Sequence, residues 1–122
     1  MDKAWAFVAV TLLGTVAGQL LLKFALEQGE EMPATITEIA HFVFRSLLNP
    51  LVLLSLALAF VAALAWIAAL SRLDISQAYP FMALAFMLVT VLSAIFLGES
   101  VSALRWGGSI VVVLGLIMVA KG

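Results

Sequence analysis

The chain has 122 residues, of which 66% are hydrophobic and 11% are charged, and its formal net charge is −1. Ordinary soluble domains are roughly 45–50% apolar and about 25% charged, so this composition excludes a soluble fold and predicts a protein solvated by lipid. The absence of cysteine excludes disulfides and thiolate chemistry, the lone His41 does not form a metal site by itself, and no basic run indicates a nucleic-acid partner. We therefore expect no metal and no cofactor.

Four apolar stretches follow one another along the chain: residues 4–26, 51–70, 78–97 and 101–120. Each has about the 20 residues, and as a helix the ~30 Å, that crossing a bilayer requires. Only helices satisfy their own backbone groups at that depth in a chain without an alternating strand pattern. The sequence predicts an all-α membrane protein in which residues 1–122 form a single four-helix transmembrane domain.

The first stretch also has features of a secretory signal, because Lys3 precedes an apolar run that reaches the small residues Ala17 and Gly18. The apolar run continues past this point to Leu26. We therefore expect the segment to be retained as a span.

The segment between the first two stretches has a periodicity of its own. Its apolar residues recur at spacings of three and four with polar residues between them: Ile36, Ile39, Ala40, Val43 and Leu47 against Glu38, His41 and Arg45. This pattern predicts a short interfacial helix over residues 34–48 that lies on the membrane surface, with His41 on its polar face. An ordered polar loop is the alternative interpretation.

Capping residues mark the ends of the later spans. Asn49 and Pro50 have the order of an N-cap and a first helical position, Gly98 is placed to end the third span, and Ser100 or Ser102 is expected to cap the fourth. The basic residues outside or near the span ends do not fix an orientation, because they divide evenly: Lys3, Arg72 and Lys121 on one side, and Lys23, Arg45 and Arg105 on the other.

Polar residues inside the spans form a pattern. In the first span Thr11, Thr15, Gln19 and Lys23 are each four residues apart, so the stripe drifts by only ~40° per step and stays on one side of the helix. Ser55 and Trp66 share a face of the second span, and Tyr79, Thr90 and Ser93 share a face of the third. Together these residues predict a sparse polar groove.

Each of these features also has a structural interpretation. Serine and threonine hydroxyls commonly bond to their own helix backbone. Lys23 lies near the end of its span, so it either extends its ammonium to the headgroup region or binds a headgroup. Gln19 is different, because a buried amide costs free energy unless it has partners. Gly14 and Gly18 flank the stripe and permit a close helix–helix approach.

All seven carboxylates lie outside the spans or at their edges: Asp2, Glu27, Glu30, Glu31, Glu38, Asp74 and Glu99. A proton-coupled exporter of cationic drugs needs a buried acid in mid-membrane, so this distribution argues against drug/proton antiport. The sequence contains no apparent nucleophile–base pair or metal cluster, and we do not expect an enzyme.

Several motifs resemble the drug/metabolite transporter superfamily of EamA-like proteins: Ala17-Gly18-Gln19-Leu20-Leu21-Leu22-Lys23, Ala78-Tyr79-Pro80, Leu97-Gly98-Glu99, and Trp106-Gly107-Gly108 with Gly115. Among its small four-helix members, the Gly-Gln-x-x-x-Lys element is most similar to the aminoarabinose–undecaprenyl phosphate flippase subunits. The small multidrug resistance proteins are more distant, since they place a glutamate in the first span where this chain has Thr15 or a neighbour.

This resemblance implies a multi-pass protein of the bacterial plasma (inner) membrane that functions as a dimer. The partner is either a second copy, for which an antiparallel arrangement is compatible with the balanced charges, or a similar small subunit. We expect five glycines to pack helices: Gly14 and Gly18, and in the motifs of the last span Gly107, Gly108 and Gly115.

We therefore expect a flippase subunit that moves a polyprenyl-phosphate-linked sugar or a related lipid phosphate. A polar stripe that ends in a cation, with no carboxylate to compete for a phosphate, motivates this hypothesis. Lys23 is expected to bind the phosphate, Gln19 and Tyr79 to bond to sugar or phosphate oxygens, and Thr15 and Trp66 to line the same path. A small multidrug-resistance-type exporter of small molecules and a non-transporting partner subunit of another membrane protein remain as alternatives.

Overall fold

The computed structural model describes residues 3–29 and 31–122, and every regular element in these ranges is helical. In chain order the elements are α1 (Lys3–Glu27), α2 (Ile36–Ser46), α3 (Pro50–Leu70), α4 (Ile75–Ala78), the 3-10 turn η1 (Tyr79–Met82), α5 (Ala83–Phe96) and α6 (Ala103–Lys121). Four stretches within the described chain are long and apolar enough to cross a membrane: Lys3–Glu27, Pro50–Leu70, Ile75–Phe96 and Ala103–Lys121. The prediction of an all-α protein with four apolar spans is confirmed.

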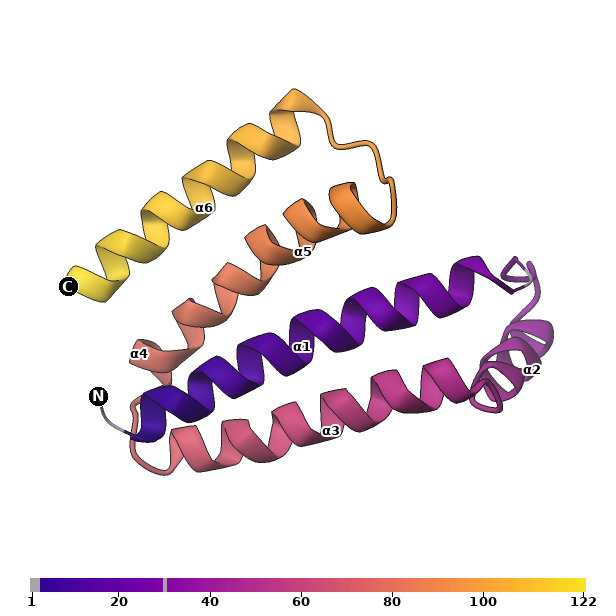
Figure 1. Ribbon diagram of the computed structural model, residues 1–122, viewed down its shortest axis with the longest axis horizontal. Coiled ribbons are helices and arrows are strands. Elements are labelled where there is room, and N and C mark those ends of the chain that lie inside the picture. Colours follow the sequence, from indigo (N-terminus) through magenta and orange to yellow (C-terminus); the bar gives the residue numbers. More distant parts are fainter. Residues whose placement is uncertain (1–2, 30) are drawn as a thin grey trace.

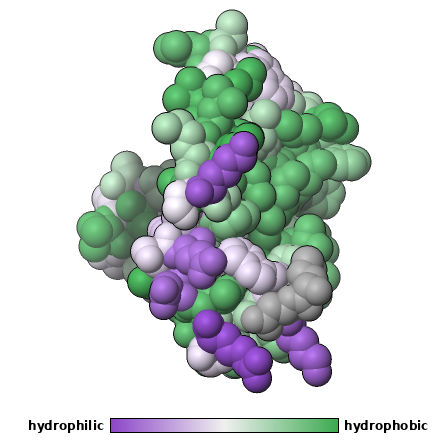
Figure 2. Space-filling view, turned by 90° about the vertical axis from the view of Figure 1, so that its left-hand side faces the viewer, coloured by the Kyte–Doolittle hydropathy of each residue, from purple (hydrophilic) through white to green (hydrophobic). Residues whose placement is uncertain are grey.

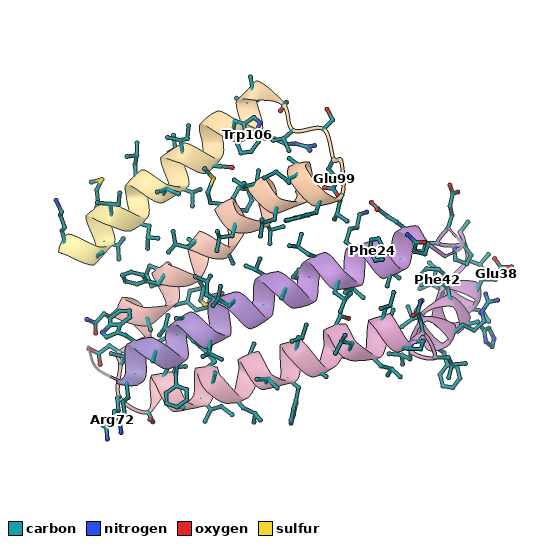
Figure 3. All side chains as sticks on the ribbon, in the orientation of Figure 1. Phe24, Glu38, Phe42, Arg72, Glu99 and Trp106 are labelled. Carbon is teal, nitrogen blue, oxygen red and sulfur yellow. The ribbon has the colours of Figure 1, made fainter. Side chains whose placement is uncertain are left out.

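The spans form two pairs (Figure 1). The helices α1 and α3 run alongside each other, α5 packs on α1, and α6 contacts α5 and diverges from the rest. The start of α1, the end of α6 and the 71–74 turn lie at one end of the bundle, and α2 lies at the other (Figure 1). Figure 2, which faces the end with the termini, shows hydrophilic side chains gathered there beside a largely apolar surface. In Figure 3, Arg72 lies at this end, whereas Glu38 and Glu99 lie at the opposite one.

The caps act as the sequence indicated. The side-chain oxygen of Asn49 accepts a hydrogen bond from the Leu51 amide at 2.9 Å, and Pro50 begins α3. Ser102, and not Ser100, caps α6, since its hydroxyl oxygen accepts from the Arg105 amide at 3.2 Å. Gly98 follows α5 with a φ of +66°, in the left-handed region that glycine adopts without steric cost.

The segment after α1 is a helix rather than a polar loop, and it is shorter than the predicted 34–48. It begins at Ile36 because the Thr35 hydroxyl accepts a hydrogen bond from the Glu38 amide and caps the first turn. None of its residues is buried, and Ile36 and Phe44 are strongly exposed. The placement of this helix on a membrane surface stays a prediction.

The third span differs from the continuous helix predicted over residues 78–97. It begins with α4 at Ile75 and passes through η1 before the regular α-helix starts at Ala83. Pro80 explains the change, because proline has no amide hydrogen to donate and its ring crowds the preceding turn. A short 3-10 segment accommodates it.

Glycine allows α1 and α3 to approach closely. A Cβ atom added to Gly18 would lie 3.1 Å from the carbonyl oxygen of Ser55, and one added to Gly14 would lie 3.2 Å from the Cβ of Ala62. These distances are shorter than ordinary contacts, so the two glycines set the separation of the helices.

The glycines of α6 behave differently. A Cβ added to Gly107, Gly108 or Gly115 would meet no atom within 4 Å among the residues that the structure describes. The packing predicted for these three glycines is therefore not to another described helix of this chain. Their role in helix packing stays a prediction.

Aromatic side chains close the end of the bundle near the termini. Val8, Ala69 and Ala78 are buried there, with Trp5 and Phe81 packed against them. The rings of Trp5 and Phe81 meet edge to face with centroids 4.9 Å apart. This cluster fixes η1 against the first helix pair and so positions the residues that follow α3.

Candidate substrate groove

A groove of about 360 Å³ opens between α1, α3 and η1. Five lining residues come from α1 (Thr11, Thr15, Gly18, Gln19, Leu22), six from α3 (Ser55, Leu56, Ala59, Ala62, Ala63, Trp66) and two from η1 (Tyr79, Met82). The wall is mostly apolar with a small number of hydrogen-bonding groups, which is the usual character of a small-molecule site. Six of the polar or aromatic residues predicted to share a groove are brought together here: Thr11, Thr15, Gln19, Ser55, Trp66 and Tyr79.

Two of the hydroxyl groups are engaged with backbone. The Thr11 Oγ1 lies 2.8 Å from the carbonyl oxygen of Phe7 in its own helix and 3.2 Å from that of Ala62 in α3. The Ser55 hydroxyl donates to the carbonyl oxygen of Val52 at 2.6 Å. These two residues therefore stabilise α1 and α3 rather than offering a free donor to a ligand, as the structural interpretation of such residues anticipated.

Gln19 and Thr15 keep their hydrogen-bonding capacity. Neither side chain makes a hydrogen bond to any other residue within the described ranges. Both line the groove, one helical turn apart. An amide or hydroxyl in an apolar setting gains free energy when a ligand or a second chain supplies the missing partner.

An aromatic pair closes one end of the groove. The rings of Trp66 on α3 and Tyr79 on η1 meet edge to face, with centroids 6.2 Å apart and planes at 63°. Tyr79 is 64% exposed, so most of its ring and hydroxyl group is accessible. The pair offers one flat apolar face and one polar tip at the same place.

Lys23 does not line the groove, although it belongs to the same four-residue stripe. The stripe drifts by ~40° at each step, and over the three steps from Thr11 to Lys23 this amounts to ~120°. Lys23 therefore lies ~120° around the helix from Thr11, although only ~40° from Gln19, and it is exposed one helical turn beyond Gln19 along α1.

Thr90 and Ser93 were expected in the groove and lie outside it. Their hydroxyl groups donate to the carbonyl oxygens of Phe86 at 2.7 Å and Thr90 at 3.1 Å. The grouping of these residues with Tyr79 assumed one continuous helix. The 3-10 geometry of η1 breaks that periodicity, so the prediction was wrong for these two residues.

Small residues of α3 were missed. Ala59, Ala62 and Ala63 form part of the groove wall, and with Ser55 they leave the space that larger side chains would fill. A signal for them existed in the sequence, because positions 55, 59 and 62 are small and recur at spacings of four and three on one helix face.

No carboxylate among the described residues lines the groove. Asp2 and Glu30 lie outside the described residues, and the other five acids do not contribute to the lining. The described chain also contains no group of three histidine, cysteine or acidic residues placed to hold a metal ion. The chemistry offered here is hydrogen bonding and apolar contact.

Four apolar helices and a groove with a few hydrogen-bonding groups define a small multi-pass membrane protein. The chain is 35% identical to the probable 4-amino-4-deoxy-L-arabinose-phosphoundecaprenol flippase subunit ArnF of Erwinia tasmaniensis, over 98% of this chain and 94% of that protein. It is 31% identical to the probable flippase subunit ArnE, with the same printed substrate, of Pectobacterium atrosepticum, over 93% of this chain and 94% of that protein. ArnE of Aeromonas salmonicida is also 31% identical, over 91% and 90%.

The chain belongs to this family of flippase subunits, and the resemblance stated from its motifs is confirmed. These relatives are named as probable flippase subunits. No family model matches the chain, and no solved structure matches it.

Proposed function

We propose that this protein is one subunit of a flippase that carries a polyprenyl-phosphate-linked sugar across the bacterial plasma membrane. In this mechanism the lipid tail stays in the bilayer and the headgroup passes along the groove between α1 and α3. The observation that carries the proposal is the pair Gln19 and Thr15, which face the groove with no hydrogen-bond partner among the described residues. The names of the relatives support a sugar phosphate linked to undecaprenol as the substrate.

Each groove residue has a proposed role. Gln19 and Tyr79 form hydrogen bonds to sugar or phosphate oxygens, and Thr15 adds a hydroxyl beside them. The indole of Trp66 provides an apolar face for the sugar ring. Lys23 lies ~6 Å beyond Gln19 along the helix axis, where its long side chain attracts the phosphate as the headgroup leaves the groove.

The transport unit is proposed to contain two chains, either two copies or this chain with a similar small subunit. The open side of the groove and the uncovered face of α6 support this assembly, since both leave surface that a second chain can cover. The amphipathic helix α2 is proposed to lie on the membrane surface. Its exposed apolar residues support contact with lipid.

A small multidrug-resistance-type exporter is the second candidate, and one observation weighs against it. Coupling export to protons requires an acid that alternates between a proton and a cationic substrate. The five described carboxylates all lie outside the groove. The third candidate, a non-transporting partner subunit, differs from the flippase in having no translocation activity as a purified protein.

The proposal predicts that translocation depends on the groove. In proteoliposomes, Gln19→Leu and Tyr79→Phe should each slow the movement of a fluorescent polyprenyl-phosphate sugar by about tenfold or more, because each removes hydrogen bonds to a charged or sugar headgroup. Gln28→Leu, which removes the same amide just beyond α1, should leave the rate unchanged. Lys23→Ala should abolish translocation while leaving the protein folded.

Undiminished translocation in both groove variants would overturn the groove as the path. Normal flipping by Lys23→Ala would remove only Lys23 from the mechanism. Proton flux driven by a soluble substrate, without lipid movement, would favour the exporter. Failure of the wild-type protein to translocate lipid, together with a stoichiometric membrane partner, would favour the non-transporting subunit.

A further inference from the structure

The hydrogen-bonding groups that remain free in the groove both donate and accept. The side chains of Thr15, Gln19 and Tyr79 line the groove and make no hydrogen bond to another described residue. An amide has two N–H donors and a carbonyl acceptor, and a hydroxyl group both donates and accepts. Sugar hydroxyls have the same dual character, whereas the oxygens of an ionised phosphate only accept. These three side chains therefore complement a sugar more fully than a phosphate.

No lysine or arginine lines the groove. All six such residues of the chain lie among the described residues, so this holds for the whole sequence. An anion that enters a largely apolar site without a charged partner loses hydration free energy that neutral hydrogen bonds do not fully replace. The phosphate of a lipid headgroup is therefore more stable outside the groove than inside it.

The aromatic pair at one end of the groove has the same preference. The faces of aromatic rings carry negative partial charge, so they attract the C–H groups of a sugar ring and disfavour an anion. Trp66 is only partly buried, and its ring meets that of Tyr79 edge to face with the centroids 6.2 Å apart. Trp66 therefore offers an apolar contact to a sugar ring at the place where Tyr79 offers a hydroxyl group.

The size of the groove matches one sugar. Its volume of about 360 Å³ is near the lower end of the roughly 300–1,000 Å³ found for small-molecule sites. Alanines at positions 59, 62 and 63 keep the α3 wall low. Ala63 is exposed and lines the groove, so a larger side chain at this position would occupy space that the groove now leaves open.

Lys23 lies just beyond the groove and can hold the phosphate there. It is exposed and follows Gln19 by four residues, which places it ~6 Å further along α1 and ~40° around the helix. Its long, flexible stem allows the ammonium group to reach a phosphate that is joined to a sugar beside Gln19. One glycosyl phosphate can therefore contact the groove and Lys23 at the same time.

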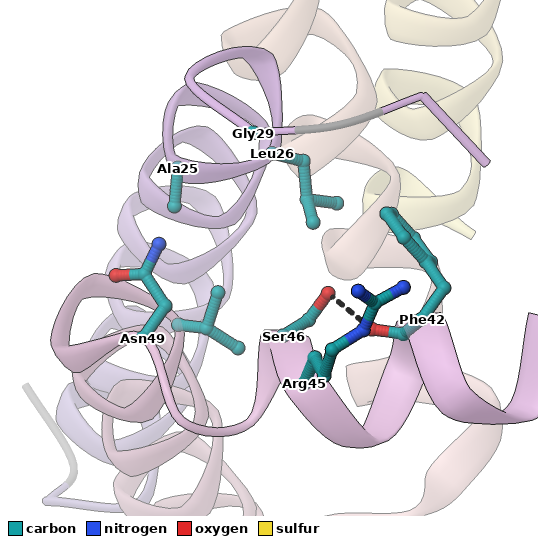
Figure 4. A pocket seen from close by; sticks show the side chains of 8 residues that line it. Ala25, Leu26, Gly29, Phe42, Arg45, Ser46 and Asn49 are labelled. Atoms are coloured by element: carbon teal, nitrogen blue, oxygen red, sulfur yellow. Dashed lines mark hydrogen bonds between the residues drawn. The ribbon is translucent and has the colours of Figure 1, made fainter.

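The cavity at the α2 end of the bundle differs in its chemistry from the groove. It has about 220 Å³ and shares no lining residue with the groove (Figure 4). Its Ser46 hydroxyl donates to the carbonyl oxygen of Phe42 at 2.9 Å, and its Asn49 side-chain oxygen accepts from the Leu51 amide at 2.9 Å. These groups hold helix turns, and the aromatic ring among the described lining residues is that of Phe42, which has no polar tip. The features that recognise a sugar are thus those of the groove.

We propose that the groove binds the sugar of the substrate lipid and that the phosphate stays outside it, beside the Lys23 ammonium group. The choice of a sugar–phosphate lipid as the ligand rests on the proposed function. In this arrangement Gln19 and Thr15 bond to sugar hydroxyls, and Trp66 packs against the ring. The sugar, rather than the phosphate, determines which lipid the groove accepts.

The test compares two short-chain polyprenyl phosphodiesters in equilibrium binding to the purified protein in detergent. One carries a single arabinosyl group, and in the other a methyl group replaces the sugar, so the two probes have the same charge. The wild-type protein should bind the arabinosyl probe about tenfold or more tightly, because only this probe fills the groove and bonds to its free polar groups. Equal binding of the two probes would overturn the proposal.

Two groove variants should lose this preference. Gln19→Leu removes the hydrogen bonds to the sugar and Ala63→Leu fills its space, so each should reduce the preference to about threefold or less. Both should bind the methyl probe within about twofold of the wild type, since the phosphate lies elsewhere. Gln28→Leu and Ala57→Leu are the matched controls, because they make the same changes at exposed residues that do not line the groove. Their preference should equal that of the wild type.

Lys23→Ala provides the reciprocal measurement. It should weaken the binding of both probes by a similar factor, about fivefold or more, and leave the preference for the arabinosyl probe unchanged. Undiminished binding of both probes in Lys23→Ala would overturn the position of the phosphate. An equal loss for both probes in Gln19→Leu would place the phosphate inside the groove and would also overturn the proposal.

The outcome for the flippase is measured separately, as translocation of the same two probes in proteoliposomes. Sugar-selective binding that depends on Gln19, without any translocation, would remove the flippase proposal and leave the sugar site. Translocation of both probes at the same Gln19-dependent rate would remove the sugar assignment and leave the flippase.

Discussion

Gly18 shows how a single residue shapes the groove. The absence of its Cβ lets the α3 backbone approach α1 to the point where an added carbon would lie 3.1 Å from the Ser55 carbonyl oxygen. Gly18 also lines the groove between Thr15 and Gln19. The same residue therefore sets the helix separation and the width of the groove.

We expect Gly18→Val to destabilise the protein by about 1–3 kcal/mol, because the branched side chain has to displace the α3 backbone. Thermal unfolding in detergent measures this change. Ala17→Val is the matched control on the exposed face of the same helix, and it should leave the unfolding temperature nearly unchanged. Equal behaviour of the two variants would show that the close approach of α1 and α3 does not limit stability.

At this scale the sequence predicted which side of α1 faces the groove, because a four-residue spacing keeps Thr11, Thr15 and Gln19 together. It did not predict which hydroxyl is free. Thr11 reaches across to Ala62 in α3, a contact that depends on how the two helices are packed, whereas Thr15 makes no such bond. The periodicity of a sequence predicts which residues share one face of a helix. It does not predict which atoms of the neighbouring helix those residues contact.

The start of α6 illustrates the element scale. The link from α5 ends at Ser102, whose hydroxyl oxygen holds the Arg105 amide in the first turn. Two serines were equally placed in the sequence for this role, and only the backbone geometry selects between them. Ser102 is extended, with φ of −67° and ψ of 158°, as an N-cap residue requires.

We expect Ser102→Ala to weaken the first turn of α6 by about 1 kcal/mol, which corresponds to about fivefold faster amide hydrogen exchange in that turn. Hydrogen–deuterium exchange of peptides covering residues 103–106 measures the effect. Ser100→Ala removes the same hydroxyl two residues earlier and should not change the exchange. A larger effect of Ser100→Ala would contradict the assignment of the cap.

Most elements followed from local signals, such as Asn49 with Pro50 at the start of α3 and Gly98 after α5. The break in the third span did not. A proline is tolerated in the first turn of a helix, so Pro80 alone was compatible with a helix that starts at residue 78. The helix begins instead at Ile75, which leaves Pro80 beyond the first turn and forces the 3-10 segment.

At the scale of the whole molecule, the two helix pairs differ in how many of their residues are buried. Within an 18-residue apolar window of each span, 22% of the residues are buried in each of the first two spans, against 6% in the third and 11% in the fourth. On α6 the buried residues Ser109 and Leu116 mark the side toward the rest of the chain. The side with Gly108 and Gly115 is open, so the second pair has a surface for another chain or for lipid.

We expect a second copy to contact this open side of α6. Val112 is the middle residue of α6, with nine residues on either side, so it meets its copy whether the two helices run parallel or antiparallel. Since the chain has no cysteine, Val112→Cys introduces a single thiol that should form an intermolecular disulfide under mild oxidation in membranes.

Ile110→Cys provides the control for this experiment. It is also exposed, lies only two residues away, and points about 160° from Val112 around the helix. It should cross-link much less. No cross-linking at Val112, or equal cross-linking at both positions, would show that α6 does not pair with another copy through this side.

The ring contacts at the end of α3 connect the two helix pairs. Trp66 meets Tyr79, and Trp5 meets Phe81, on either side of Pro80. Because Tyr79 also forms part of the groove wall, a ligand that enters between Tyr79 and Trp66 has to separate one of the ring contacts between the two pairs. We therefore expect a ligand bound at this point to change the tilt of α5 and α6 relative to α1 and α3, where a neighbouring subunit of the proposed transport unit would sense it.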